Sequence, residues 1–106
     1  MEGARAEKLP VHERLIIKSG GEAYFTGDGA AYLAEKGVKL IGTDSNSVGI
    51  HGAQVAPHRA FLTAEVAVLE NLDLDEVRPG KYFLSALPLK IGGAEAAPVR
   101  AVLISA

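Results

Sequence analysis

The segment 57–71, PHRAFLTAEVAVLEN, places one histidine and one carboxylate on either side of an otherwise apolar stretch. His58 lies in a predicted turn and Glu70 at the end of a predicted strand, so a chain that folds back can bring both side chains to one point. Imidazole and carboxylate together suit zinc or manganese. Spacing alone does not decide the matter, because a lone histidine and a lone glutamate are more often unrelated and two ligands do not make a catalytic site.

Three other groups of residues could do chemistry, and each has a simpler interpretation. GDGAAY at 27–32 precedes a predicted helix, where free N–H groups could hold a phosphate or a small molecule. Tyr32 stands in place of the third glycine of a dinucleotide-binding loop, so helix capping is favoured. LDLDEV at 72–77 lacks the glycine and spaced ligands of a calcium loop and indicates a solvated turn. His12 and His51 lie in polar or glycine-rich context and are expected to be exposed.

Composition excludes several classes of protein. The 106 residues are 48% hydrophobic, which suits one small domain that buries ~65% of the surface its unfolded form exposes. The net charge of −2 is spread along the chain and supplies no basic stripe for nucleic acid. Without cysteine there can be no disulfide, thiolate metal site or cysteine nucleophile. The apolar run at 15–17 is too short for a signal peptide or a membrane span, and a soluble cytoplasmic protein is expected.

The order of apolar segments predicts an α/β fold rich in strands, with about five strands and one or two short helices. A helix capped by Thr26 or Asp28 and stopped at Gly37 would join the first two strands in βαβ fashion. A helical turn should begin at Pro57 and run to about Ala64, because proline tolerates the first helical position. The expected strands lie at 14–17, 38–44, 66–69, 81–91 and 99–104.

The remaining segments predict turns, loops and a loose start. Residues 1–13 are polar and are expected to be poorly ordered. Residues 45–56 are rich in serine, asparagine and glycine and predict a long loop, while 92–98 reads as a hairpin-like connection. Pro88 cannot donate to a sheet ladder, so its strand must lie at an edge or contain a bulge.

Four segments in this order resemble the C-terminal half of the cyclase family: LIIKSG, YFTGDG…LAEKGVKLIGTDSNSVG, PHRAFL…VLENL and LPLKIGGAEAAPVRAVLI. These metal-dependent hydrolases include bacterial kynurenine formamidase and isatin hydrolase. The resemblance covers the chain from about Arg14 to Ile104, with matching motif order and loop lengths. It implies the C-terminal half of a cyclase-like swivelling β/β/α fold, so that residues 1–106 would form a single, partial domain.

The resemblance turns the first pair of residues into a predicted metal site. In the family, the histidine of the HR segment and the acidic residue before NL are metal ligands, and these match His58 and Glu70. A divalent ion, zinc or manganese, would lower the pKa of a water molecule and polarise a carbonyl group. The implied reaction is hydrolysis of a small amide, formamide or cyclic amide, with Glu70 as a ligand that could bridge two ions.

The chain departs from the family at one important point. The HxGTHxD…H motif of the family's N-terminal half, which supplies most metal ligands and the catalytic histidine, does not occur in the sequence. A working site would need a partner chain that carries this motif, and the isolated chain is expected to be inactive. The alternative is a non-catalytic remnant or interaction module that keeps the fold. No catalytic residue is assigned under either hypothesis.

In the family fold the two halves pack together, so without the N-terminal half the strand edges and apolar faces of the second half would be exposed to solvent. The candidate surfaces are 15–17, 38–41 and 83–91. Exposed strand edges recruit other strands, and large apolar patches mark interfaces. The chain is therefore expected to form a homo-oligomer or to pair with a complementary chain, with a small molecule as substrate and neither nucleic acid nor membrane as partner.

Overall fold

The computed structural model describes residues 12–88 and 96–105. The chain divides into two compact units, Met1–Asp75 and Glu76–Ala106. Within the described residues, the first unit holds a three-stranded parallel sheet with two helices, and the second holds a two-stranded antiparallel sheet. These elements confirm the predicted α/β class with five strands and two short helices. The prediction for residues 1–13 falls mainly outside the described part of the chain.

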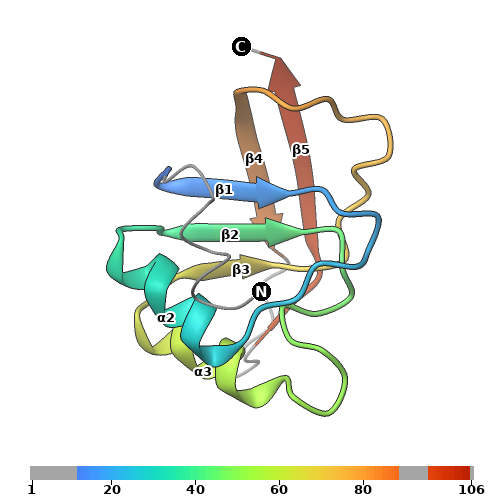
Figure 1. The fold of residues 1–106 in the computed structure, drawn as a ribbon. Coiled ribbons are helices and arrows are strands. Elements are labelled where there is room, and N and C mark those ends of the chain that lie inside the picture. Colours follow the sequence, from blue (N-terminus) through green and yellow to red (C-terminus); the bar gives the residue numbers. More distant parts are fainter. Residues whose placement is uncertain (1–11, 89–95, 106) are drawn as a thin grey trace. The chain divides into compact units, whose positions relative to one another are not determined.

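A parallel sheet with the strand order β1-β2-β3 is the frame of the first unit (Figure 1). Its strands are β1 (Arg14–Ile17), β2 (Leu40–Thr43) and β3 (Ala67–Leu69). Ile41 lies opposite Leu15 on one side and Val68 on the other, so these three side chains share one face. Because all three strands are parallel, their carboxyl ends meet along one edge of the sheet.

Helix α2 (Gly27–Glu35) joins β1 to β2 and confirms the predicted βαβ connection. Thr26 is its N-cap, and the Thr26 hydroxyl accepts a hydrogen bond from the N–H of Gly29 at 3.1 Å. Gly37 follows the helix with a φ of 99°, a left-handed conformation that glycine adopts readily and that ends the helix. The glycine-rich stretch is thus a helix cap, as predicted.

Helix α3 (Val55–Thr63) joins β2 to β3 and begins earlier than the sequence predicts. The helix was expected to start at Pro57, whereas Pro57 occupies its third position. A proline is tolerated there because the first N–H groups of a helix have no acceptor within the helix. The earlier start puts Gln54, the residue before the helix, one turn ahead of His58.

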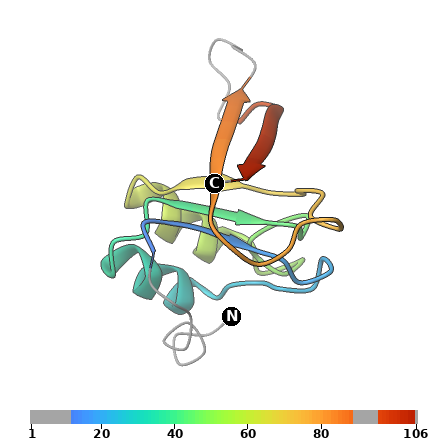
Figure 2. The same cartoon turned by 90° about the horizontal axis from the view of Figure 1, so that it is seen from above.

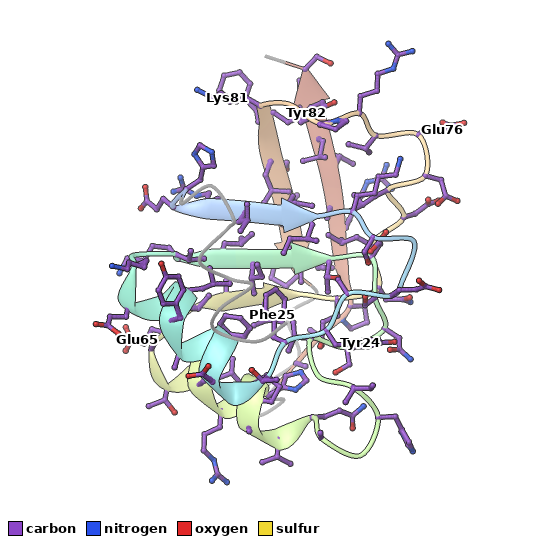
Figure 3. All side chains as sticks on the ribbon, viewed as in Figure 1. Tyr24, Phe25, Glu65, Glu76, Lys81 and Tyr82 are labelled. Carbon is purple, nitrogen blue, oxygen red and sulfur yellow. The ribbon has the colours of Figure 1, made fainter. Side chains whose placement is uncertain are left out.

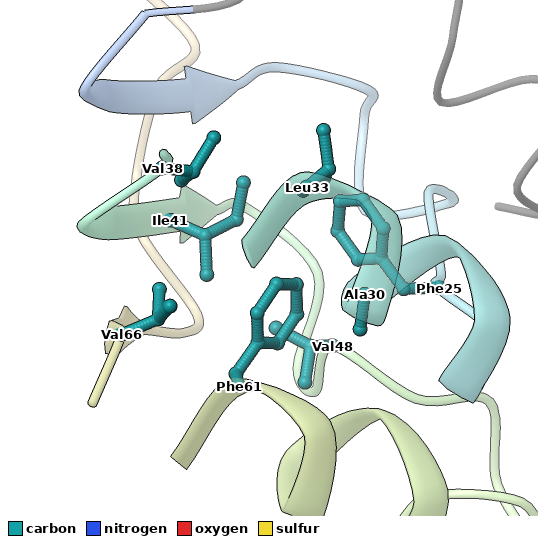
Figure 4. Packing of buried hydrophobic residues seen from close by; sticks show 8 residues of the cluster. All are labelled: Phe25, Ala30, Leu33, Val38, Ile41, Val48, Phe61 and Val66. Carbon is teal, nitrogen blue, oxygen red and sulfur yellow. The ribbon is translucent and has the colours of Figure 1, made fainter. Parts of the chain in front are cut away.

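Both helices lie on the Ile41 face of the sheet and enclose the core with it (Figures 2 and 4). Phe25 and Phe61 meet edge to face, with ring centroids 5.5 Å apart. Leu33 of α2 and Ile41 of β2 are fully buried beside them. Figure 3 shows Phe25 directed into this layer and Glu65 directed outwards. No helix within the described ranges is long and apolar enough to cross a membrane.

The opposite face of the sheet carries Ile16, Leu40 and Leu69, which are half-buried. Neither of the two described helices covers it. The expectation that 38–41 would be an exposed apolar surface is wrong for Val38 and Ile41, which are 1% and 0% exposed. Their side chains point to the face that the helices cover, which apolar composition alone does not reveal.

The second unit is an antiparallel pair of strands, β4 (Tyr82–Pro88) and β5 (Val99–Ser105). Pro88 pairs with Val99 at the end of β4. Both strands of a two-stranded sheet are edge strands, so the prediction that Pro88 lies in an edge strand is confirmed. The predicted continuation of this strand to Ile91 lies outside the described residues, as does most of the connection expected at 92–98.

One face of the β4–β5 pair carries four large apolar side chains beside Ser85 and Arg100. The register places Phe83 opposite Ile104, with Val102 and Leu87 further along the same face. These four side chains are exposed by 66%, 55%, 40% and 69%, respectively. We call these four residues the hairpin face. Of these four, Phe83 and Leu87 belong to the predicted surface 83–91, and both are exposed.

Candidate metal centre

Polar side chains gather at the carboxyl edge of the parallel sheet. Asp44 follows β2 directly, Glu70 follows β3 directly, and Ser19 lies two residues after β1. Ligands of open parallel sheets bind outside the carboxyl ends of the strands. The edge of the sheet is therefore the place to look for a site in the first unit.

His58 and Glu70 are in direct contact. Nε2 of His58 lies 2.9 Å from Oε2 of Glu70. The two side chains are 31% and 30% exposed, so solvent and small ligands can reach them. The fold-back that the sequence suggested does bring the two residues together. Their role as metal ligands stays a prediction.

The other ring nitrogen of His58 is fixed by the backbone of α3. Nδ1 lies 2.8 Å from the carbonyl oxygen of Gln54, one helical turn earlier. A carbonyl oxygen can only accept, so Nδ1 carries the hydrogen and donates it. In a neutral ring, Nε2, the atom that faces Glu70, would then be the nitrogen without a hydrogen.

Both nitrogens of His58 consequently face acceptors, although a neutral imidazole has a single N–H. With Nδ1–H committed to Gln54, the lone pair of Nε2 points at a carboxylate oxygen. Two such atoms at 2.9 Å need a positive charge between them, either a proton on Nε2 or a cation bound by both. The donor set fits a divalent metal, because histidine ligands commonly donate their second N–H to a backbone carbonyl.

Glu70 is held by one oxygen only. Oε2 also accepts a hydrogen bond from the N–H of Val48 at 2.7 Å. Oε1 accepts none from any residue that the structure describes. The next residue, Asn71, has a left-handed φ of 58°, and its N–H donates to the carbonyl of Ser45 at 2.7 Å. The chain thus anchors one carboxylate oxygen and leaves the other available.

Two backbone groups of this centre are not apparent from the sequence: the N–H of Val48 and the carbonyl of Gln54. Both belong to the segment 45–56, which the sequence marks only as a long loop. Backbone donors and acceptors carry no residue-type signature. Only the serine and glycine content of the loop hints that the chain makes tight turns there.

The remaining candidates do not join the pair. His12 and His51 are exposed, as predicted, and so are Asp73 and Asp75 in the solvated turn. Across residues 12–88 and 96–105, no group of three or more His, Cys, Asp or Glu side chains could hold a metal ion. The described chain therefore offers a partial ligand set of one imidazole and one carboxylate.

Comparison with solved structures defines the class of fold. A protein described as a potential metal-dependent hydrolase with cyclase activity superposes on 97% of this chain with a TM-score of 0.82 and 29% identity. The match covers 57% of that protein. The fold is that of one part of a cyclase-like hydrolase.

Sequence comparison narrows the class to a family, although no family model matches the chain. Kynurenine formamidase of Bordetella avium (strain 197N) is 40% identical over 109 residues, which cover 92% of this chain and 51% of that protein. Cyclase-like protein 2 of Oryza sativa subsp. japonica is 44% identical over 82 residues, 76% of this chain and 30% of that protein. The chain is a homologue of the cyclase and kynurenine formamidase family. It spans about half the length, or less, of these relatives.

Proposed function

We propose that the chain supplies one half of a metal-dependent hydrolase site, in which His58 and Glu70 hold a zinc or manganese ion. The observation that carries this proposal is the contact between Nε2 of His58 and Oε2 of Glu70, where an imidazole nitrogen and a carboxylate oxygen lie 2.9 Å apart. Both atoms can lie within ~2.0–2.2 Å of one ion. The homology to metal-dependent hydrolases supports the same assignment.

The chain's own residues would orient the site rather than complete it. Gln54 fixes the ring of His58 so that the lone pair of Nε2 is presented, and Val48 fixes Oε2 of Glu70. A bound ion would activate a water molecule and polarise the carbonyl of a small amide, formamide or cyclic amide. The acid and base that move protons in such a reaction would come from the complementary half, since no further titratable side chain among the described residues hydrogen-bonds to the pair.

The proposal includes a partner, which is either a complementary chain that carries the HxGTHxD half or a second copy of this chain, and only the complementary chain would supply the missing ligands. Parallel sheets are almost always covered on both faces, and no described helix covers the face with Ile16, Leu40 and Leu69. The hairpin face exposes four large apolar side chains on one face of the β4–β5 pair. The relatives have about twice the length of this chain, or more, which is room for such a half.

A non-catalytic interaction module of the same fold is the second candidate. The small number of ligands favours this candidate, because the described residues provide only one histidine and one carboxylate, fewer than the three or more protein ligands of a typical metal site. Such a module would keep the sheet and the pair but would bind metal weakly.

The test measures hydrolysis of formamide and lactam substrates with added zinc or manganese. The chain is assayed alone and with the N-terminal half of a kynurenine formamidase supplied in trans. We expect negligible turnover by the chain alone, turnover by the pair of halves, and loss of that turnover in His58→Ala. His51→Ala, which changes an exposed histidine of the same loop region, is the matched control and should retain it.

Two results would contradict the proposal. Turnover by the paired halves that survives His58→Ala would remove this residue from the site. Absence of both turnover and metal binding in every combination would favour the non-catalytic module. Light scattering tests the partner separately, and a folded monomer of the chain at micromolar concentration, with cooperative unfolding, would contradict the expected association.

A further inference from the structure

Gly49 stands at the closest approach between the loop after β2 and the start of α3. A Cβ atom at this position would lie 2.6 Å from Cα of Gln54, 2.8 Å from Cγ of Pro57 and 3.0 Å from the carbonyl oxygen of Ala53. Non-bonded carbon atoms pack at about 3.5–4.0 Å. The nearest atom belongs to the backbone, which cannot rotate aside. The position therefore has no room for any side chain.

Space, and not backbone conformation, makes glycine necessary here. Gly52, three residues later, has a φ of 89° and is a glycine for conformational reasons. Gly49 is not among the residues with positive φ. Gly49→Ala is therefore a steric probe of one contact, without added strain from a left-handed backbone.

The groups that hold the two site residues lie on opposite sides of this contact. Val48, directly before Gly49, gives its N–H to Oε2 of Glu70 at 2.7 Å. Gln54, whose Cα is the nearest atom to the missing Cβ, gives its carbonyl to Nδ1 of His58 at 2.8 Å. The separation of loop and helix start thus determines how the imidazole and the carboxylate are placed. We propose that Gly49 is a positioning residue, which sets the distance and orientation between His58 and Glu70.

The loop side of the contact is the firmer one. The N–H of Gly49 donates to Oγ of Ser47 at 3.2 Å, and Ser47 is 7% exposed. The carbonyl of Val48 accepts from the N–H of Phe25 at 2.6 Å. By contrast, Gln54 makes no side-chain hydrogen bond as the N-cap of α3. An added methyl group at Gly49 will push the first turn of α3 away, and the carbonyl that fixes His58 moves with it.

The experiment compares Gly49→Ala with Gly42→Ala in the 106-residue chain. Gly42 is the control for a second, less crowded glycine. A Cβ there would lie 3.1 Å from the side-chain atoms Cγ1 of Ile16 and Cδ1 of Leu72, in β2 and not against Gln54. The readout is the Nδ1–H resonance and ring tautomer of His58 in nitrogen-15 NMR spectra. We expect the wild type and Gly42→Ala to show a hydrogen-bonded Nδ1–H, and Gly49→Ala to lose it.

A second readout is the zinc affinity of the chain paired with a complementary half, which Gly49→Ala should weaken by about 10–100-fold. Only this readout depends on the proposed function. Wild-type protein with a fixed His58 ring and no zinc binding would refute the metal site and leave the role of Gly49 standing. Wild-type-like Nδ1–H signal and affinity in Gly49→Ala would overturn the role of Gly49. If Gly49→Ala does not fold, Ser47→Ala is used, since it removes only the acceptor of the Gly49 N–H, and an unchanged His58 resonance would again overturn the inference.

Discussion

Asp44 and Glu70 are carboxylates that follow neighbouring strands of one sheet, and their surroundings differ in one decisive way. Both oxygens of Asp44 accept hydrogen bonds, from the N–H and hydroxyl of Ser19 at 2.9–3.1 Å and from the N–H of Gly20 at 2.9 Å. Glu70 has one N–H donor, Val48, and faces a ring nitrogen that cannot donate when the histidine is neutral. The charge of Asp44 is stabilised by N–H and O–H donors of the chain, whereas that of Glu70 is balanced either by a proton on Nε2 of His58 or by a bound cation.

The pKa of Asp44 is lowered by the hydrogen bonds that stabilise its charge. Burial on its own would raise this pKa, but hydrogen bonds from Ser19 and from the N–H groups of Gly20 and Gly21 outweigh it and hold the pKa below its usual value. Ser19 Oγ also accepts from the N–H groups of Glu22 and Ala23, so the carboxylate organises the whole turn after β1. Asp44 is a structural clamp.

The largest expected effect concerns metal affinity. Glu70→Gln keeps the shape of the side chain but removes its charge, and should weaken zinc binding by the paired halves by at least about 100-fold. Asp44→Asn should change that affinity by no more than about threefold, roughly 0.5 kcal/mol, because both oxygens of Asp44 are already occupied by hydrogen bonds from the turn after β1. Isothermal titration with zinc measures both. Equal losses in the two variants would show that the site includes Asp44.

Thermodynamic stability should respond in the reverse order. Asp44→Asn places an NH2 group against N–H donors, and the free energy of unfolding should fall by about 1–2 kcal/mol. Glu70→Gln retains an acceptor for the N–H of Val48 and should change it by less than about 0.5 kcal/mol. Urea denaturation followed by circular dichroism gives both values. A larger loss in Glu70→Gln would mean that the His58–Glu70 contact is itself a structural ion pair.

Substitutions of Asn71 measure how much the left-handed backbone conformation beside Glu70 contributes to the free energy of unfolding. Its φ of 58° costs most residues roughly 1 kcal/mol, less for asparagine, and almost nothing for glycine. Asn71→Ala should therefore lower the free energy of unfolding by about 1 kcal/mol, while Asn71→Gly should stay within about 0.5 kcal/mol of the wild type. Thermal unfolding of both variants provides the measurement. Similar behaviour of the two would indicate that the side chain, and not the conformation, matters.

The smallest effect is on the pH dependence of stability. Because the pKa of Asp44 is lower in the folded chain than in the unfolded one, its contribution is fully present above the unfolded pKa. The contribution is lost as the pH falls below about 4 and through the folded pKa. The gap in stability between wild type and Asp44→Asn should therefore narrow on acidification from neutral pH. A constant gap would show that Asp44 acts by shape rather than charge.

The sequence predicts those parts of the fold that depend on local signals. The helix α2, capped at Thr26 and ended at Gly37, follows from side-chain chemistry over a few residues. The strands follow from short apolar runs. Apolar composition does not tell which face of a strand the helices cover, and it therefore predicts a surface at Val38 and Ile41, although both are buried.

The candidate site depends on long-range geometry that the sequence shows only through family resemblance. Spacing alone does not pair His58 with Glu70, because their contact depends on α3 beginning at Val55 and on the chain turning at Asn71. The role of Gly49 was not apparent at all, since its need for space arises from a helix start five residues away. Family resemblance named the two side chains, and only the structure supplies the backbone groups that hold them.

The pairing of β2 with the chain after β3 continues past Glu70. The N–H of Asn71 donates to Ser45 at 2.7 Å, and the N–H of Leu72 donates to Thr43 at 3.0 Å. The backbone before Glu70, in β3, and the backbone after it, at Asn71 and Leu72, are therefore both hydrogen-bonded to β2 and the residues that follow β2. Ordering a flexible residue costs about 1–2 kcal/mol of backbone entropy, and a glutamate side chain adds up to about 2 kcal/mol. Folding has already ordered this backbone, and the N–H of Val48 restricts the side chain, so a ligand that binds at Glu70 loses little conformational entropy.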